Sequence, residues 1–112
     1  MKTHEEKRQY PRCDYSSPIL LHRLDRQDLN YYAEMKDYSR GGMSLMTNEK
    51  LVVGHLVYLE MKNYNEHAAG PEKCRSYHGS VRWLTHFPSS DGNVKDLYKY
   101  GIEYNLPACY EC

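Results

Sequence analysis

The hydrophobic residues of this chain recur mostly at every second position, in short runs separated by polar segments. In residues 55–61, for example, Val57, Leu59 and Met61 fall on one side of an extended chain. Alternation of this kind predicts strands that bury one face. Runs with a helical period are short, so the pattern predicts an all-β protein with little helix.

Six such runs predict six strands, and the segments between them carry the residues of turns. The predicted strands are residues 17–24, 29–35, 41–47, 55–61, 79–87 and 97–105. The first two flank the polar DRQD and predict a hairpin, whereas residues 63–73 and 88–96 predict longer loops. Short strands at this spacing indicate a small antiparallel barrel or sandwich. We favour a closed barrel, because closure hides the edges that an open sheet would expose.

The aromatic composition bears on the core. The chain has 12 Tyr but only one Phe and one Trp. Tyrosine is favoured in strands, where its ring can be buried while its hydroxyl reaches a polar partner. We therefore expect a core built largely from tyrosine. Val81, Trp83 and Phe87 follow the same alternation, which predicts that Trp83 lies in the core or at the barrel rim.

Charge and length limit the classes of function. The 112 residues fit one domain, and 15 basic and 15 acidic side chains cancel. A neutral chain has no overall field to attract nucleic acid or an anionic membrane, so an anion site must be local. No run approaches the roughly 20 apolar residues of a membrane span, and the start lacks a signal-peptide pattern. We predict a cytoplasmic protein without membrane insertion.

We divide the chain into a flexible N-terminal arm at 1–15, a barrel at 16–106 and a short cysteine-containing tail at 107–112. The four cysteines are Cys13, Cys74, Cys109 and Cys112. In a reducing compartment they are expected to be thiols. The terminal CYEC supplies only two of the four ligands of a structural zinc, so we predict neither a metal nor a cofactor.

Two polar motifs carry the candidate chemistry. Arg8 and Arg12 form an R-x-x-x-R pair on the predicted arm. Asp37, Ser39 and Gly42 form a D-x-S-x-x-G motif in the predicted connection between the second and third strands. Arginine forks bind phosphate and also match the O6 and N7 acceptors of guanine. An aspartate complements the donors on the other guanine edge. Adjacent glycines allow positive φ and close approach of a ligand to the backbone.

These two motifs, RQYPR and DYSRGG, resemble the signature motifs of the PilZ domain family in type and order. The later segments GSVRW and YGIEY are similar to further strands of that family. The resemblance spans the chain from about Lys7 to Asn105. It implies a six-stranded antiparallel β-barrel of split-barrel type that binds the bacterial second messenger cyclic di-GMP.

Carried over residue by residue, the resemblance implies ligand contacts from the motif positions. These are Arg8, Arg12, Asp37, Ser39 and Gly42. Further contacts are Arg40 and Gly41, at the variable positions of the second motif, and Lys7, directly before the first arginine. Binding would order the arm and alter a surface that a downstream protein partner recognises. The resemblance leaves open whether one or two nucleotides bind.

Other interpretations remain open at this point. The two arginines could be solvated charges on a polar arm. The DYSRGG segment could be a turn whose Asp37 or Ser39 caps backbone N–H groups, and a self-capped turn could also bind a ligand. As alternatives in function, the chain could be a degenerate PilZ-like scaffold that binds a protein without nucleotide, a redox or metal protein working through CYEC, or a nucleic-acid binder. Catalysis is not expected, since the sequence marks no nucleophile with its base.

Overall fold

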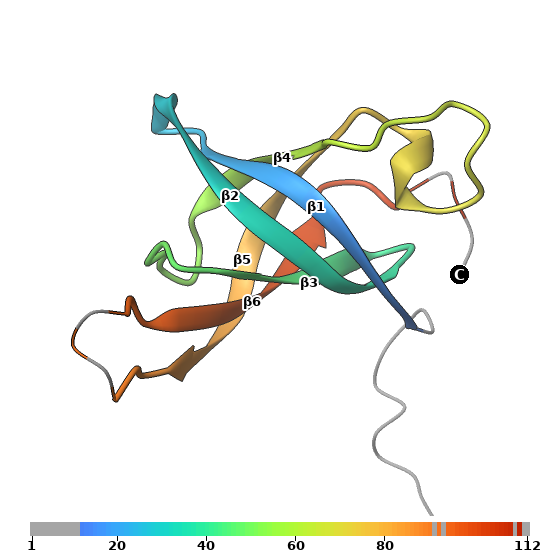
Figure 1. Ribbon diagram of the computed structural model, residues 1–112. Helices are drawn as coiled ribbons and strands as arrows, with labels where there is room; N and C mark the ends of the chain where they lie inside the picture. Colours follow the sequence, from blue (N-terminus) through green and yellow to red (C-terminus); the bar gives the residue numbers. More distant parts are fainter. Residues whose placement is uncertain (1–11, 91, 93, 109, 111–112) are drawn as a thin grey trace, which may run out of the picture.

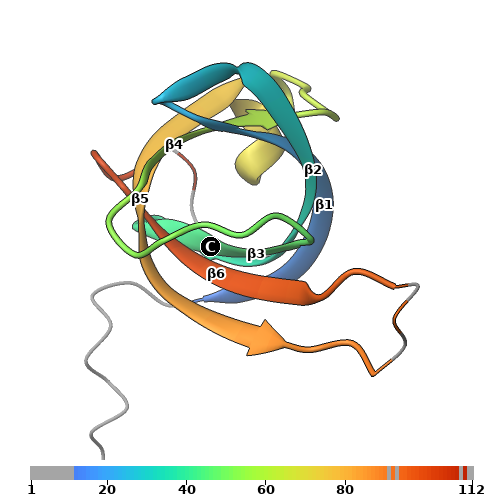
Figure 2. The same cartoon turned by 90° about the vertical axis from the view of Figure 1, so that its left-hand side faces the viewer.

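The chain folds into a closed antiparallel barrel of six strands, seen in a computed structural model that describes residues 12–90, 92, 94–108 and 110. The spatial order is β1-β2-β3-β6-β5-β4, and β4 pairs with β1 to complete the ring (Figures 1 and 2). The strands are β1 (Cys13–Arg23), β2 (Arg26–Ser39), β3 (Gly42–Thr47), β4 (Leu56–Met61), β5 (Ser76–Phe87) and β6 (Leu97–Tyr104). The predicted all-β, six-stranded antiparallel barrel is confirmed. One 3-10 turn, η2 (Pro71–Lys73), follows β4.

Several strands are longer than the alternation predicted. Strand β1 already begins at Cys13, within the segment predicted as the arm, and Cys13 lies opposite Tyr38 of β2. Strand β2 continues to Ser39, so Asp37 and Ser39 belong to a strand. The prediction that placed them in a connection is wrong, and only residues 40 and 41 separate β2 from β3.

The barrel interior is filled mainly by aliphatic side chains and methionine. Of the 17 buried hydrophobic residues, four are tyrosines, so the expected tyrosine-rich core is wrong. A buried phenol needs a partner for its hydroxyl, which the aliphatic centre of a barrel does not offer. Tyr100 finds partners at the barrel wall, donating to the Glu49 carbonyl (2.8 Å) and accepting from the Leu51 N–H (2.7 Å). The predicted inward face of Val57, Leu59 and Met61 is confirmed, with Met61 only 3% exposed.

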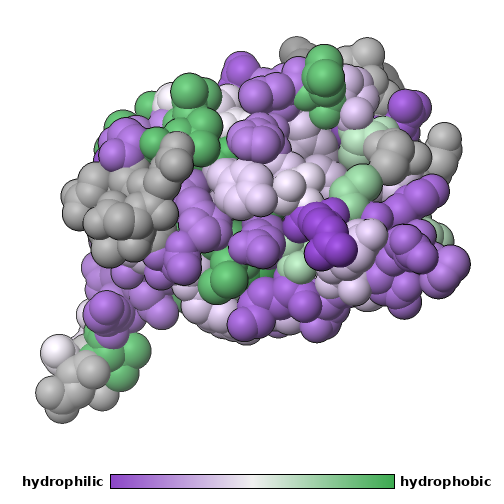
Figure 3. All heavy atoms as spheres, turned by 90° about the horizontal axis from the view of Figure 1, so that it is seen from above, coloured by the Kyte–Doolittle hydropathy of each residue, from purple (hydrophilic) through white to green (hydrophobic). Residues whose placement is uncertain are grey.

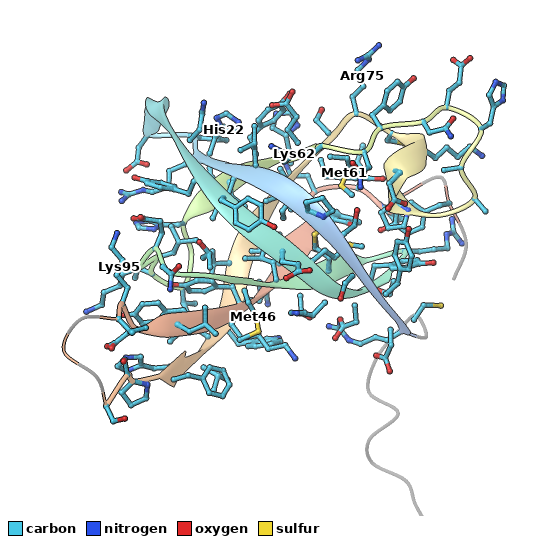
Figure 4. All side chains as sticks on the ribbon, in the orientation of Figure 1. His22, Met46, Met61, Lys62, Arg75 and Lys95 are labelled. Atoms are coloured by element: carbon cyan, nitrogen blue, oxygen red, sulfur yellow. The ribbon has the colours of Figure 1, made fainter. Side chains whose placement is uncertain are left out.

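The segment between β4 and β5 packs against the start of β1 through a buried carboxylate. Glu72 of η2 is 7% exposed and accepts hydrogen bonds from the Tyr15 hydroxyl (2.8 Å) and the Ser17 hydroxyl (2.7 Å). At the end of this segment, Arg75 points away from the barrel and lies 4.3 Å above the Tyr64 ring centroid (Figure 4). The loop is therefore fixed to the barrel at η2 rather than projecting freely.

The far ends of β5 and β6 form a two-stranded ribbon that extends beyond the barrel (Figure 1). Every residue of β5 from Arg82 to Phe87 is exposed. Viewed from above, the surface is mostly hydrophilic with separate hydrophobic groups (Figure 3). Among the described residues, no helix is long and apolar enough to cross a membrane.

Candidate functional site

The two sequence motifs meet at the start of β1. The Nη1 atom of Arg12 donates to Oδ1 of Asp37, forming an ion pair between residues 25 positions apart. Both side chains are largely covered, at 24% and 16% exposed. Lys7 and Arg8 lie outside the described residues. Of the arginine pair, the structure therefore places Arg12 against the second motif.

A β-bulge sets the direction in which Asp37 points. Met35 lies opposite Leu45, and both are fully buried. The register then shifts by one residue at Lys36, and Asp37 lies opposite Ser44, on the other face of the sheet. Bulges commonly redirect side chains in this way beside functional sites. Without the extra residue, Asp37 would follow Met35 into the core.

A second bulge acts in the same way on β5. Val81 lies opposite Ile102, but after a register shift at Arg82, Trp83 lies opposite Gly101. Trp83 is therefore on the outer face and is 39% exposed. The expectation that it shares the inward face of Val81 is wrong, because the bulge reverses the alternation between them.

Between these redirected residues lies a shallow pocket of about 160 Å³. The second motif and the β5–β6 pair form its opposite walls, with Arg12 at its edge. Its lining residues are Arg12, Ser39, Gly41, Gly42, Arg82, Trp83, Gly101, Ile102 and Glu103. Two predicted contacts that the structure describes do not line this pocket: Asp37 reaches it through its ion pair with Arg12, and Arg40 is turned toward Ala108.

Two glycines of the pocket are required by close packing. A Cβ at Gly42 would lie 1.9 Å from the carbonyl oxygen of Ile102, so only glycine lets β3 approach β6 here. A Cβ at Gly101 would lie 2.1 Å from Nε1 of Trp83, whose indole covers that position. Among the described residues, only Gly54 has positive φ. The expected use of Gly41 and Gly42 for positive φ is therefore wrong, and strand contact explains Gly42 instead.

Ser39 is held by its own turn. Its hydroxyl accepts a hydrogen bond from the Gly41 N–H (3.2 Å), which is the self-capping arrangement considered from the sequence. Ser39 is 7% exposed and lines the pocket. The capping turn and the pocket wall are thus the same residues, so the turn is preorganised for a ligand.

Five residues of the pocket, all from β5 and β6, had no predicted role in binding, and three of them carry polar or aromatic groups. Arg82 and Glu103 form an ion pair across β5 and β6 at the pocket mouth, and the Trp83 indole forms part of its wall. Their signal was present in GSVRW and YGIEY, which were noted as family-like strands. Their convergence on the second motif depends on the β3–β6 pairing, which the sequence pattern does not reveal.

The side chains at the pocket combine guanidinium donors with an aromatic face, which suits a planar ligand that carries phosphate. Two guanidinium groups and the indole line or border the pocket, and the carboxylates of Asp37 and Glu103 accompany them. A guanidinium has five N–H donors, so Arg12 can keep its bond to Asp37 and still bind a phosphate. Within the described part of the chain, no three His, Cys, Asp or Glu side chains are placed to hold a metal ion.

The cysteines differ from expectation in one respect. Cys13 is disulfide-bonded, whereas a thiol was expected. The expectation rested on the predicted compartment alone. Cys109 and Cys112 lie outside the described residues.

Behind the second motif, two buried tyrosines form a hydrogen-bonded pair. The hydroxyls of Tyr104 and Tyr110 are 2.6 Å apart. Burial raises the pKa of Tyr104 well above its ordinary value, with Tyr110 adding to the shift. Tyr104 therefore remains a neutral hydrogen-bonding group at any physiological pH.

Comparison with known proteins finds one family in both its sequence and its structural matches. The family model of the PilZ domain matches residues 6–107. Among solved structures, the PilZ domain with c-di-GMP of YcgR from Escherichia coli is similar, with a TM-score of 0.60 and 13% identity. The match covers 89% of this chain and 79% of that one. No curated protein matches the sequence significantly.

Proposed function

Because this chain belongs to the PilZ domain family, we propose that it is a receptor for cyclic di-GMP which binds the nucleotide at the pocket between the second motif and the β5–β6 pair. The observation that carries the proposal is the Arg12–Asp37 ion pair, which joins the two motifs. The similar YcgR domain was solved with this nucleotide, which supports the choice of ligand.

In the proposed complex, Arg8 and Arg12 bind phosphate and a guanine edge, and Asp37 accepts from guanine donors. Ser39 and the backbone around Gly41 and Gly42 form the opposite wall, with Lys7 and Arg40 as further candidates. The Trp83 indole offers a face on which a base can stack, and Arg82 offers a second guanidinium to phosphate. Binding requires these groups to grip the ligand rather than to break a bond, so we assign no catalytic step.

The proposed output is a change of surface. Arg12 lies directly before β1 and lines the pocket, so closing the arm over a nucleotide would reshape the face beside the pocket. Disorder-to-order changes of this kind are a common switching mechanism. We propose that a downstream protein partner in the bacterial cytoplasm recognises the closed form. The alternative function, a scaffold that binds a partner without nucleotide, predicts no response to cyclic di-GMP.

Calorimetric titration with cyclic di-GMP tests the proposal, with GTP and linear diguanylate as controls for specificity. Arg12→Ala should weaken binding at least tenfold, because one charge-assisted bidentate contact contributes about 1.5–3 kcal/mol. Arg23→Ala is the matched control, since Arg23 lies at the other end of β1 and pairs with Asp25 (2.7 Å).

We expect the Arg23 variant to bind cyclic di-GMP with the affinity of the wild type. The same titration gives the number of nucleotides bound per chain. Equal affinity for the wild type and the Arg12 variant would reject the assigned site. If titration of cyclic di-GMP into the folded wild type gives no binding heat, the scaffold function is favoured. The next experiment would then be a search for its protein partner.

A further inference from the structure

The C-terminal segment bonds directly to the backbone of the second motif. Three successive carbonyl groups of that motif each accept a hydrogen bond from this segment or from the end of β6. The Ser39 carbonyl accepts from the Tyr110 hydroxyl (2.8 Å), that of Arg40 from the Ala108 N–H (2.8 Å), and that of Gly41 from the Tyr104 N–H (2.9 Å). The pocket wall is therefore supported from behind by residues near the end of the chain.

Tyr110 is built into this support. It is 1% exposed, and its ring packs edge-to-face on Tyr38, with centroids 5.3 Å apart. A carbonyl only accepts, so the Tyr110 hydrogen is committed to Ser39, and the Tyr104 hydroxyl donates in turn to the Tyr110 oxygen. The hydroxyls of Tyr104 and Tyr110 thus form a chain of two hydrogen bonds that ends at the carbonyl of Ser39.

The same segment also fixes the Ser39 hydroxyl through one peptide unit. In a planar trans peptide, the C=O and the following N–H point in opposite directions. The Ala108 N–H holds the Arg40 carbonyl, which directs the Gly41 N–H the other way, and that N–H donates to the Ser39 hydroxyl. The carbonyl and the hydroxyl of Ser39 are therefore both held in place from the C-terminal side.

We propose that Tyr110 is a positioning residue for the nucleotide site and that docking of the segment around Ala108 and Tyr110 is coupled to ligand binding. This inference rests on the proposed function. Tyr110 touches the pocket wall from behind and acts through Ser39. Coupling is reciprocal, so a ligand that needs Ser39 in this orientation must also stabilise the docked segment.

The test compares two substitutions that each delete one buried hydroxyl and keep the ring. Tyr110→Phe removes the bond to Ser39, while Tyr100→Phe removes bonds to Glu49 and Leu51, which do not line the pocket. We expect Tyr110→Phe to raise the Kd for cyclic di-GMP about three- to tenfold, the effect of one net hydrogen bond. Tyr100→Phe should lower the melting temperature yet leave the Kd unchanged.

Hydrogen exchange supplies the reciprocal readout. In the wild type, saturating cyclic di-GMP should slow exchange of the Ala108 amide, which donates to Arg40. An unchanged Kd in Tyr110→Phe, or an equal rise in both variants, would overturn the positioning role. An Ala108 amide that exchanges equally fast with and without ligand would overturn the coupling.

Failure of the proposed function would look different. If the folded wild type does not bind cyclic di-GMP, the function is rejected before any variant is compared. Exchange of the Gly41 amide without ligand then still tests the support, since it should be faster in Tyr110→Phe than in Tyr100→Phe. Equal rates in the two variants would reject the support itself.

Discussion

At the scale of single residues, the candidate site depends on contacts between residues that are far apart in the sequence. Arg12 and Asp37 were selected as members of separate motifs, and they form an ion pair. Gly42 was selected for backbone freedom, but close contact with β6 requires it. Tyr110 carried no signal at all, because its partner is the carbonyl of Ser39, 71 residues away. Motifs reveal side-chain chemistry and cannot reveal a distant backbone acceptor.

The role of Gly42 can be tested directly. Gly42→Ala would place a Cβ 1.9 Å from the Ile102 carbonyl oxygen, so β3 and β6 must move apart. We expect unfolding free energy to fall by about 1–3 kcal/mol, as for other overpacked sites, measured by urea denaturation. The control is Gly92→Ala, where no atom lies within 4 Å of the added methyl group. Equal stability of the two variants would contradict the packing argument.

At the scale of elements, alternation identified six strands but could not locate their irregularities. The bulges at Lys36 and Arg82 each insert one residue, after which the inward and outward positions exchange. A polar residue in a bulge looks like any outward-facing position, so the sequence pattern contains no mark of it. Both bulges direct residues of the candidate site outward: Asp37 in one strand and Trp83 in the other. The bulges therefore explain both the wrong face predicted for Trp83 and the outward position of Asp37.

The attachment of the β4–β5 segment to β1 through Glu72 can also be tested at the scale of elements. Glu72→Ala would leave the hydroxyls of Tyr15 and Ser17 without their acceptor, and Ser17 is only 2% exposed. An unsatisfied buried polar group costs about 1–3 kcal/mol. We expect unfolding free energy to fall by that amount and cleavage by protease within residues 62–75 to increase. Glu66→Ala, an exposed position of the same segment, should change neither quantity.

At the scale of the whole molecule, the buried tyrosines predict how stability depends on pH. Burial raises the pKa of Tyr100 and raises that of Tyr104 well above 10. Hydrogen bonding to Glu72 raises the pKa of Tyr15. In the unfolded chain these phenols ionise near pH 10. Their contribution to stability is therefore complete below about pH 10 and is lost as the pH rises further, because the unfolded state then binds fewer protons.

Thermal unfolding between pH 7 and pH 11 measures this dependence. The wild type should lose stability steeply above about pH 10, and Tyr104→Phe should show a shallower decline, since one such phenol is removed. Tyr32→Phe is the control, because Tyr32 is 62% exposed and its hydroxyl meets water in both states. If Tyr104→Phe declined as steeply as the wild type, burial of this phenol would not be the cause.

The closed order of the strands has a further consequence. The pocket takes one wall from β2 and β3 and the other from β5 and β6, and it exists only while β3 and β6 are paired. A molecule bound there binds the folded chain and not the unfolded one, so the free energy of unfolding rises with the logarithm of its concentration once the concentration exceeds the Kd. Cellular proteases remove proteins largely through their unfolded states. The abundance of this protein would then rise with the supply of any ligand that the pocket binds.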